Sequence, residues 1–174
     1  MAQRPGLIVT GPSTPQKTAE IKTLLGALLG IAVLGLLMTY LVRCPCERIP
    51  GTVLFGVEVN APVSDWSFAN DVRLCQIQVQ GVIPWSVNLN CMADSDGALY
   101  LSCSVCEGKY WSARALASAD ARIRIAGQVF PVRLSRLQDA ETLDVAWLAR
   151  ASKTGYGVGK PRPDHWWSFA VVSR

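Results

Sequence analysis

The chain has 174 residues, of which 50% are hydrophobic and only 17% are charged, and its formal net charge is +4. An average soluble domain carries about 25% charged residues, so this composition excludes a disordered protein or a highly solvated helical array. The basic residues form no run, so the sequence indicates no nucleic-acid partner.

The N-terminal part is predicted to be a disordered tail over residues 1–20 followed by a transmembrane helix over residues 21–43. The tail carries Gly, Pro, Ser, Thr and Gln without apolar periodicity. Residues 23–42 contain no charge, and at about 1.5 Å per residue they cover the roughly 30 Å hydrocarbon core of a bilayer. The run exceeds the apolar stretch of a signal peptide, which has about 7–15 residues, so we expect an uncleaved anchor that contacts lipid through residues 23–42.

Basic residues on the two sides of this helix predict its orientation. Three precede the uncharged run over residues 23–42 and two follow it: Arg4, Lys17 and Lys22, then Arg43 and Arg48. Since the side richer in Lys and Arg stays in the cytoplasm, we expect a cytoplasmic N-terminus. The C-terminal domain of this single-pass protein is then expected outside the cytoplasm.

Residues 44–50 are predicted to form a short, stiff juxtamembrane linker with two prolines, and residues 51–174 a single domain. In this domain strand signals outnumber helix signals. The expected strands are 72–79, 85–90, 98–103, 121–125, 129–137 and 166–172, and the expected helices are 107–119 and 139–151. This order predicts a mainly β fold, a small antiparallel split β-barrel with two outer helices.

Local signals mark the ends of several of these elements. Asp96-Gly97 ends a turn before the third strand, and Gly127 lies in the turn of a hairpin. Asp139 is a plausible N-cap for the second helix. Four arginines of the hairpin are expected to form a solvated face: Arg122, Arg124, Arg133 and Arg136.

The stretch from Asp96 to Arg150 carries a succession of motifs. A D-G turn leads into an LYL strand, a short polar loop follows, and a lysine opens a helix. A hairpin then carries Gly127, Gln128, Val129 and Phe130 as a G-x-x-[FY] motif, before a D-x-E-type helix. This stretch resembles the flavin-binding split-barrel superfamily. It is similar to its pyridoxamine-phosphate-oxidase-like branch and more so to its deazaflavin-dependent nitroreductase branch.

The resemblance implies an FMN or deazaflavin cofactor lying against the barrel, often at the interface of a homodimer. The positions that match the phosphate-binding residues are Ser102, Ser104 and Lys109, and Arg114 could add a second cation. The implied function is a membrane-anchored flavin- or deazaflavin-dependent oxidoreductase that acts on a small or quinone-like acceptor.

A non-enzymatic function is the alternative hypothesis. The loop SCSVCEGK, residues 102–109, lacks the second basic residue that many flavin-binding members place beside the lysine. A degenerate barrel that keeps the fold without the cofactor would then be an accessory or scaffold subunit of a larger membrane complex. The completeness of the phosphate site discriminates between the two hypotheses.

The six cysteines leave three interpretations open. Cys103 and Cys106 form a CxxC motif between a strand and a helix, where a structural disulfide or a redox pair would fit. With Cys44 and Cys46 they could in principle bind zinc, although no metal site is favoured. Two further cysteines, Cys75 and Cys91, are expected in strands as core residues or a cross-strand disulfide.

Overall fold

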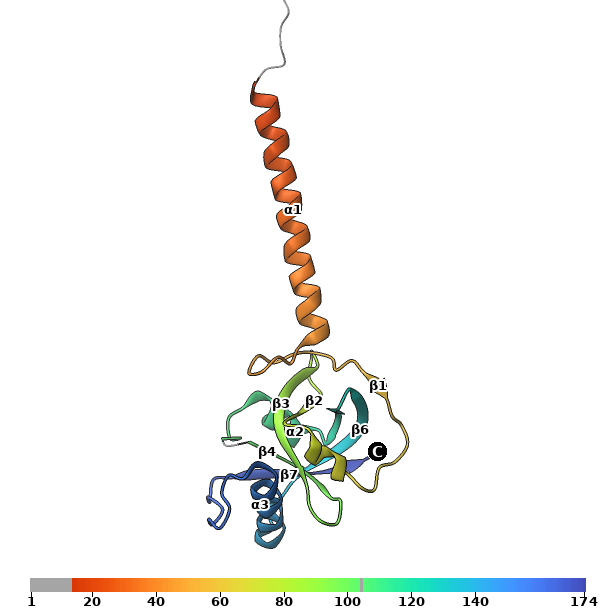
Figure 1. Cartoon of the computed structure of the whole chain (residues 1–174), viewed down its shortest axis with the longest axis vertical. Coiled ribbons are helices and arrows are strands. Elements are labelled where there is room, and N and C mark those ends of the chain that lie inside the picture. Colours follow the sequence, from red (N-terminus) through yellow and green to blue (C-terminus); the bar gives the residue numbers. More distant parts are fainter. Residues whose placement is uncertain (1–13, 104) are drawn as a thin grey trace, which may run out of the picture. The chain divides into compact units, whose positions relative to one another are not determined.

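The computed structural model describes residues 14–103 and 105–174, and the chain divides into two units, Met1–Thr39 and Tyr40–Arg174. Helix α1 (Thr14–Arg43) provides the described part of the first unit with its residues 14–39 (Figure 1). Of the predicted tail, residues 1–13 lie outside the described residues, whereas residues 14–20 are helical, so the helix begins at Thr14 instead of at residue 21.

Helix α1 has the properties of a helix that can sit in lipid. Ala19–Arg43 is long and apolar enough to cross a membrane, a test that a signal sequence near the N-terminus also passes. Two threonine hydroxyls of the apolar stretch are bonded inside the helix, since Thr23 Oγ1 donates to Ala19 O over 3.0 Å and Thr39 Oγ1 to Gly35 O over 2.8 Å. Each of these two hydroxyls therefore has a partner even without water.

The second unit is a closed barrel of six antiparallel strands (Figure 1). The strands are β2 (Cys75–Val79), β3 (Trp85–Ala93), β4 (Leu99–Cys103), β5 (Asp120–Ile125), β6 (Gln128–Arg136) and β7 (Trp167–Ser173). They follow the order β6-β5-β2-β3-β4-β7, and the pairing of β6 with β7 closes the ring. The predicted small antiparallel barrel with accompanying helices is therefore confirmed. A short strand, β1 (Val57–Glu58), adds in parallel to β6, and a 3-10 helix, η1 (Ser67–Asp71), precedes β2; the sequence indicated neither.

Side chains along each strand alternate between the two faces of the sheet, and those on one face fill the interior of the barrel. In β4, Leu101 and Cys103 join the interior cluster, whereas Tyr100 joins a second cluster on the opposite face. Helix α2 (Tyr110–Ala117) contributes Trp111 to the interior, with its ring centroid 5.3 Å from that of Phe169. This helix therefore covers part of the barrel interior.

Helix α3 (Ala140–Thr154) packs on the opposite face of the sheet. Its apolar side chains Leu143, Ala146 and Trp147 form the second cluster with Met92 and Tyr100. The predicted N-cap is confirmed, since the Asp139 side chain accepts a hydrogen bond from the Thr142 backbone N–H over 2.8 Å.

The predicted linker over residues 44–50 is an ordered turn. A disulfide joins Cys44 to Cys46, and backbone hydrogen bonds run both ways between Cys46 and Ile49. Side chains of neighbouring strands hold it: Gln76 Nε2 donates to Pro45 O over 3.1 Å, and Asn88 Nδ2 donates to Glu47 O over 2.8 Å. This turn therefore belongs to the barrel unit.

Two hairpin arginines correct the expectation of a solvated face. Arg122 donates from Nη1 to Leu54 O over 3.1 Å and forms an ion pair with Glu58. Arg124 donates from Nη1 to Phe55 O over 2.7 Å. They attach the segment that leads into β1 to the outer face of β5, which is why they are partly buried.

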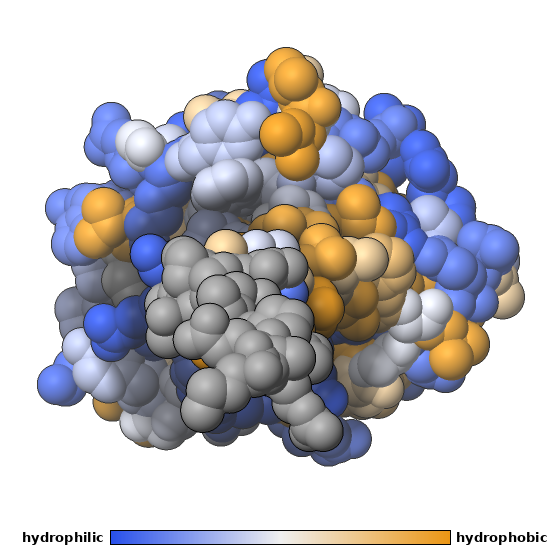
Figure 2. All heavy atoms as spheres, turned by 90° about the horizontal axis from the view of Figure 1, so that it is seen from above, coloured by the Kyte–Doolittle hydropathy of each residue, from blue (hydrophilic) through white to orange (hydrophobic). Residues whose placement is uncertain are grey.

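Over most of the surface visible in Figure 2 the residues are hydrophilic, and hydrophobic residues form separate patches.

Candidate functional site

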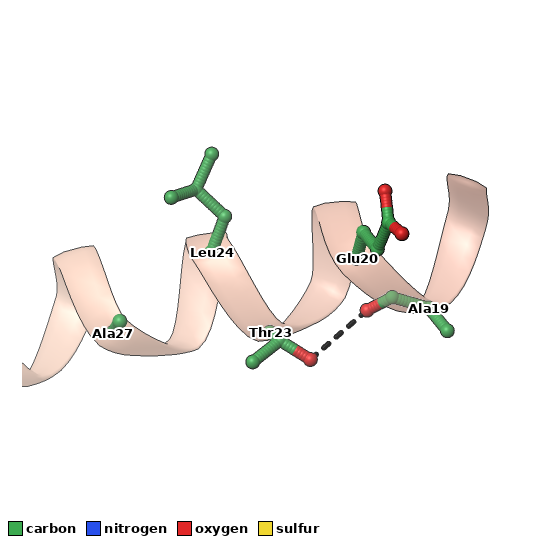
Figure 3. A pocket seen from close by; sticks show the side chains of 5 residues that line it. All are labelled: Ala19, Glu20, Thr23, Leu24 and Ala27. Atoms are coloured by element: carbon green, nitrogen blue, oxygen red, sulfur yellow. Dashed lines mark hydrogen bonds between the residues drawn. The ribbon is translucent and has the colours of Figure 1, made fainter. Parts of the chain in front are cut away.

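A depression on α1 is not a plausible site. Figure 3 shows its lining side chains, Ala19, Glu20, Thr23, Leu24 and Ala27. They follow one another along the exposed helix, and the Thr23 hydroxyl is directed to the helix backbone. Because no set of polar groups converges there, this is the ordinary surface of a helix.

The barrel unit has a hollow of about 660 Å³ between β3, the start of α2 and the juxtamembrane turn. We call it the β3–α2 groove. Its residues are Glu47, Arg48, Ile49, Pro50, Trp85, Val87, Asn88, Leu89, Lys109, Tyr110 and Trp111. The rings of Trp85 and Tyr110 meet edge to face with centroids 5.2 Å apart. Aromatic walls and a few charged groups are typical of sites that bind organic ligands.

Two cations give the groove its charge. In the described part of the chain, neither Arg48 nor Lys109 forms an ion pair with an acidic side chain. The acidic residue of the lining, Glu47, is paired with Arg73 at 3.1 Å. The groove therefore offers two positive groups to an anion while its one carboxylate is partly neutralised.

The predicted phosphate-binding residues do not all meet in this groove. Lys109 lines it at the N-cap position of α2. Ser102 is 1% exposed, and its Oγ lies 3.9 Å from Met92 Sδ, beside the second cluster. Arg114 donates from Nε to Gln80 O over 2.7 Å. Ser104 lies outside the described residues.

The groove contains residues that the sequence did not single out as site residues. Arg48 lies in the predicted linker and belongs to no motif, so nothing in the sequence indicated that it lines the same groove as Lys109. Trp85 was expected only as the first residue of a strand. The available signal was an aromatic residue at the start of a strand, Trp85, and another at the start of a helix, Tyr110. These two residues indicate a site only when the strand start and the helix start are known to be in contact.

The structure pairs each cysteine with a near neighbour or a partner on the adjacent strand: Cys44–Cys46, Cys75–Cys91 and Cys103–Cys106. The four cysteines of the zinc interpretation therefore form two separate pairs. Cys103 and Cys106 are 7% and 1% exposed. Because thiol exchange needs access to a sulfur atom, this burial favours a structural disulfide over a redox pair.

A second hollow, of about 350 Å³, lies beside the start of α3. Arg136 Cζ lies 3.6 Å from the ring centroid of Trp167, and Arg136 Nε is buried without an acceptor among the described residues. The carboxylate of Asp164 lines the same hollow. This hollow therefore offers mixed charges and no defined preference for an anion.

Buried polar groups elsewhere serve the fold. The Tyr100 hydroxyl donates to Asp94 Oδ2 over 2.9 Å, and burial, together with this bond, raises the pKa of Tyr100 to about 12. Lys153 Nζ donates to Ala69 O over 2.7 Å and to Cys91 O over 2.5 Å. These bonds join α3 to η1 and β3, away from the groove.

Comparisons with known proteins give a similarity of fold but no match of sequence. The sequence matches no family model and no curated protein. The structure is similar to the crystal structure of a NimC/NimA family protein from Clostridium acetobutylicum, with 13% sequence identity and a TM-score of 0.46. The similarity covers 62% of this chain and 78% of that one. The assignment of a closed six-stranded barrel comes from the strand pairing of this chain itself.

Proposed function

We propose that this chain is a membrane-anchored protein that binds a flavin or deazaflavin and passes electrons to a small or quinone-like acceptor. The β3–α2 groove is the observation that carries the proposal. It combines the rings of Trp85, Tyr110 and Trp111 with the cations Arg48 and Lys109. A flat aromatic ring that carries a phosphate needs both kinds of group.

Each part of the groove has its own role in this proposal. Trp85 and Tyr110 hold the ring system and set its orientation, and Lys109 and Arg48 bind the phosphate by charge-assisted hydrogen bonds. Apolar side chains of the lining, Val87 and Leu89, exclude water. A bound flavin would supply the electron transfer itself, so this chain needs no catalytic acid, base or nucleophile of its own.

The other predicted phosphate contacts, Ser102, Ser104 and Arg114, differ in whether they are free to bind a phosphate. Ser104 stands in the same loop as Lys109 and stays a proposed contact. Ser102 and Arg114 would each have to leave a present partner, Met92 Sδ and Gln80 O respectively, before they could bind a phosphate. We therefore assign the main phosphate contacts to Lys109 and Arg48.

The residues of the β3–α2 groove also favour a second candidate function, that of a non-enzymatic accessory subunit. Of the predicted residues that the structure describes, Ser102, Lys109 and Arg114, only Lys109 lines the groove. A barrel that has lost its cofactor would show such an incomplete set. In that case the chain would be an accessory or scaffold subunit of a membrane complex.

Cofactor titration tests the proposal. The absorption spectrum of the detergent-purified full chain should contain flavin or deazaflavin bands, or the protein should bind added FMN or a deazaflavin. One charge-assisted contact is worth about 1.5–3 kcal/mol, so Lys109→Ala should weaken binding about 10- to 150-fold. The exposed Lys160 lies outside the groove, and Lys160→Ala is the matched control.

The outcomes separate the two functions. A wild-type protein that binds neither cofactor at high micromolar concentration would contradict the oxidoreductase function and leave the accessory function standing. Equal affinities of wild type and Lys109→Ala would keep the cofactor but show that the phosphate site is elsewhere. Ser102→Ala should leave the affinity unchanged, since the hydroxyl is buried against Met92.

A further inference from the structure

Four exposed apolar or aromatic side chains lie near the β2–β3 loop, the juxtamembrane turn and the start of α2, and we call them the apolar rim: Ile49, Val82, Ile83 and Tyr110. Val82 is fully exposed, and Ile83, Ile49 and Tyr110 are 63%, 57% and 49% exposed. Val82 and Ile83 lie in the loop between β2 and β3, so two consecutive β-branched side chains face solvent at its tip. Neighbouring exposed apolar groups of this kind mark surfaces that contact something other than water.

Contacts within the barrel unit hold the members of the rim together. Gly51 and Ser86 exchange backbone hydrogen bonds of 2.8 and 2.9 Å, which fixes the juxtamembrane turn beside the β2–β3 loop. The Tyr110 hydroxyl lies against Gly81, where a Cβ would come within 2.8 Å of it. Arg114 of the same helix donates to Gln80 O. The loop is therefore held by α2 at the position from which its tip projects.

The rim lies where the chain enters the barrel unit. The Cys44 backbone N–H donates to Tyr40 O over 3.0 Å, and the Tyr40 hydroxyl donates to Pro50 O over 2.7 Å. A Cβ at Gly51 would collide with the backbone of Cys44, so these two residues are in close contact. The residues after the long apolar run are thus packed beside the rim, and Arg48 and Lys109 add positive charge there.

We propose that the apolar rim docks on the bilayer surface and that Val82 and Ile83 insert among the lipid headgroups. This inference rests on the proposed membrane anchor, because the lipid must begin close to Arg43 for the rim to reach it. Apolar and aromatic side chains flanked by Lys and Arg are the composition of interfacial membrane contacts. The cations favour anionic headgroups over neutral ones.

The opposite end of the barrel is expected to stay in water. Strand β3 begins beside the rim at Trp85 and ends at Ala93, about 26 Å away at about 3.3 Å per residue. Near that far end Met92 packs on Trp147, and Gly157 lies against the same tryptophan. The neighbouring Val158 is exposed, and it therefore provides a matched control position.

Fluorescence quenching by lipid tests the docking. The full chain, carrying a fluorescent amino acid in place of Val82, is reconstituted into vesicles of phosphatidylcholine and phosphatidylglycerol with and without brominated acyl chains. We expect several-fold stronger quenching of the label at 82 than of the same label at 158. With the label in place of Ile49, the double substitution Val82→Asp and Ile83→Asp should reduce the quenching.

The experiment distinguishes an error in the proposed membrane anchor from an error in the proposed docking of the apolar rim. If alkaline carbonate releases the protein from the vesicles, the anchor is wrong and the docking is wrong with it. If the protein stays in the vesicles but labels at 82 and 158 are quenched equally, the docking alone is overturned. Cofactor binding in detergent is measured separately and decides the proposed function whichever result is obtained here.

Discussion

Lys153 shows how the fold holds a partly buried cation with backbone carbonyl groups. Its Nζ donates to Ala69 O and Cys91 O, and burial lowers its pKa to about 8, an effect that nearby Asp71 opposes. An unfolded lysine has a pKa near 10.4. Between these two values the unfolded chain binds more protons at this position than the folded chain does, and stability therefore rises with pH.

We expect Lys153 to make the free energy of unfolding increase with pH between about pH 8 and pH 10. The substitution Lys153→Met should remove this increase. The slope per proton cannot exceed about 1.4 kcal/mol per pH unit, and it should be smaller because the side chain is only partly buried. Urea unfolding of both proteins, followed by tryptophan fluorescence at three pH values, measures the difference. Equal slopes would contradict the prediction.

At the scale of elements, tight turns and cross-links determine how the strands meet. The β5–β6 hairpin turns through Ala126 and Gly127, both in the left-handed region with φ of 49° and 82°. Such a turn matches the twist of antiparallel strands but suits Asn-Gly better than Ala-Gly. Strands β2 and β3 are joined by their own turn and by the Cys75–Cys91 disulfide.

Ala126→Asn should stabilise the protein by about 0.5–1 kcal/mol, because asparagine tolerates the left-handed conformation that strains alanine. Gly127→Ala should have the opposite effect and provides the internal contrast. Chemical denaturation gives both values. A destabilising Ala126→Asn would show that the turn does not have the described conformation in solution.

Removal of the β2–β3 disulfide should cost about 3 kcal/mol, since its cysteines are separated by 16 residues. The double substitution Cys75→Ala and Cys91→Ala tests this, and the pair Cys44→Ser and Cys46→Ser is the control because it closes a much shorter loop. Thiol titration of the unfolded, unreduced wild type should find fewer than six free thiols. Six free thiols would exclude disulfides in the native protein.

On the scale of the whole molecule, an exposed apolar helix is followed by a barrel unit that contains three disulfides. The helix is consistent with a membrane anchor or a signal sequence. Structural disulfides persist in oxidising compartments. The expectation from the flanking basic residues, a barrel unit outside the cytoplasm, would place these disulfides in such a compartment.

Reporter fusions after Arg174 test this orientation. Fused alkaline phosphatase should be active and fused green fluorescent protein inactive, because the C-terminus is expected outside the cytoplasm. The same fusions placed before Thr14 should give the reverse pattern. Activity of the C-terminal fusion only in the cytoplasm would reverse the orientation and make native disulfides unexpected.

Features that depend on near neighbours could be predicted from the sequence. The uncharged run over residues 23–42 predicts an apolar helix, and the structure has one. The strand around Tyr100, the turn at Gly97 and the cap at Asp139 are each decided within a few residues, and each occurs where it was predicted. The order of strands and helices followed from these signals and was enough to predict a barrel.

Contacts between distant segments were decided only by the tertiary structure. Closure of the ring pairs β6 with β7, and the carbonyl groups that Arg122 and Arg124 bind lie 68 and 69 residues away. Likewise, Arg48 reaches the groove of Lys109 only because its turn folds back on β3. Periodicity tells which face of an element is apolar but not which distant segment covers it. For this reason the fold was predictable, whereas the groove and its second cation were not.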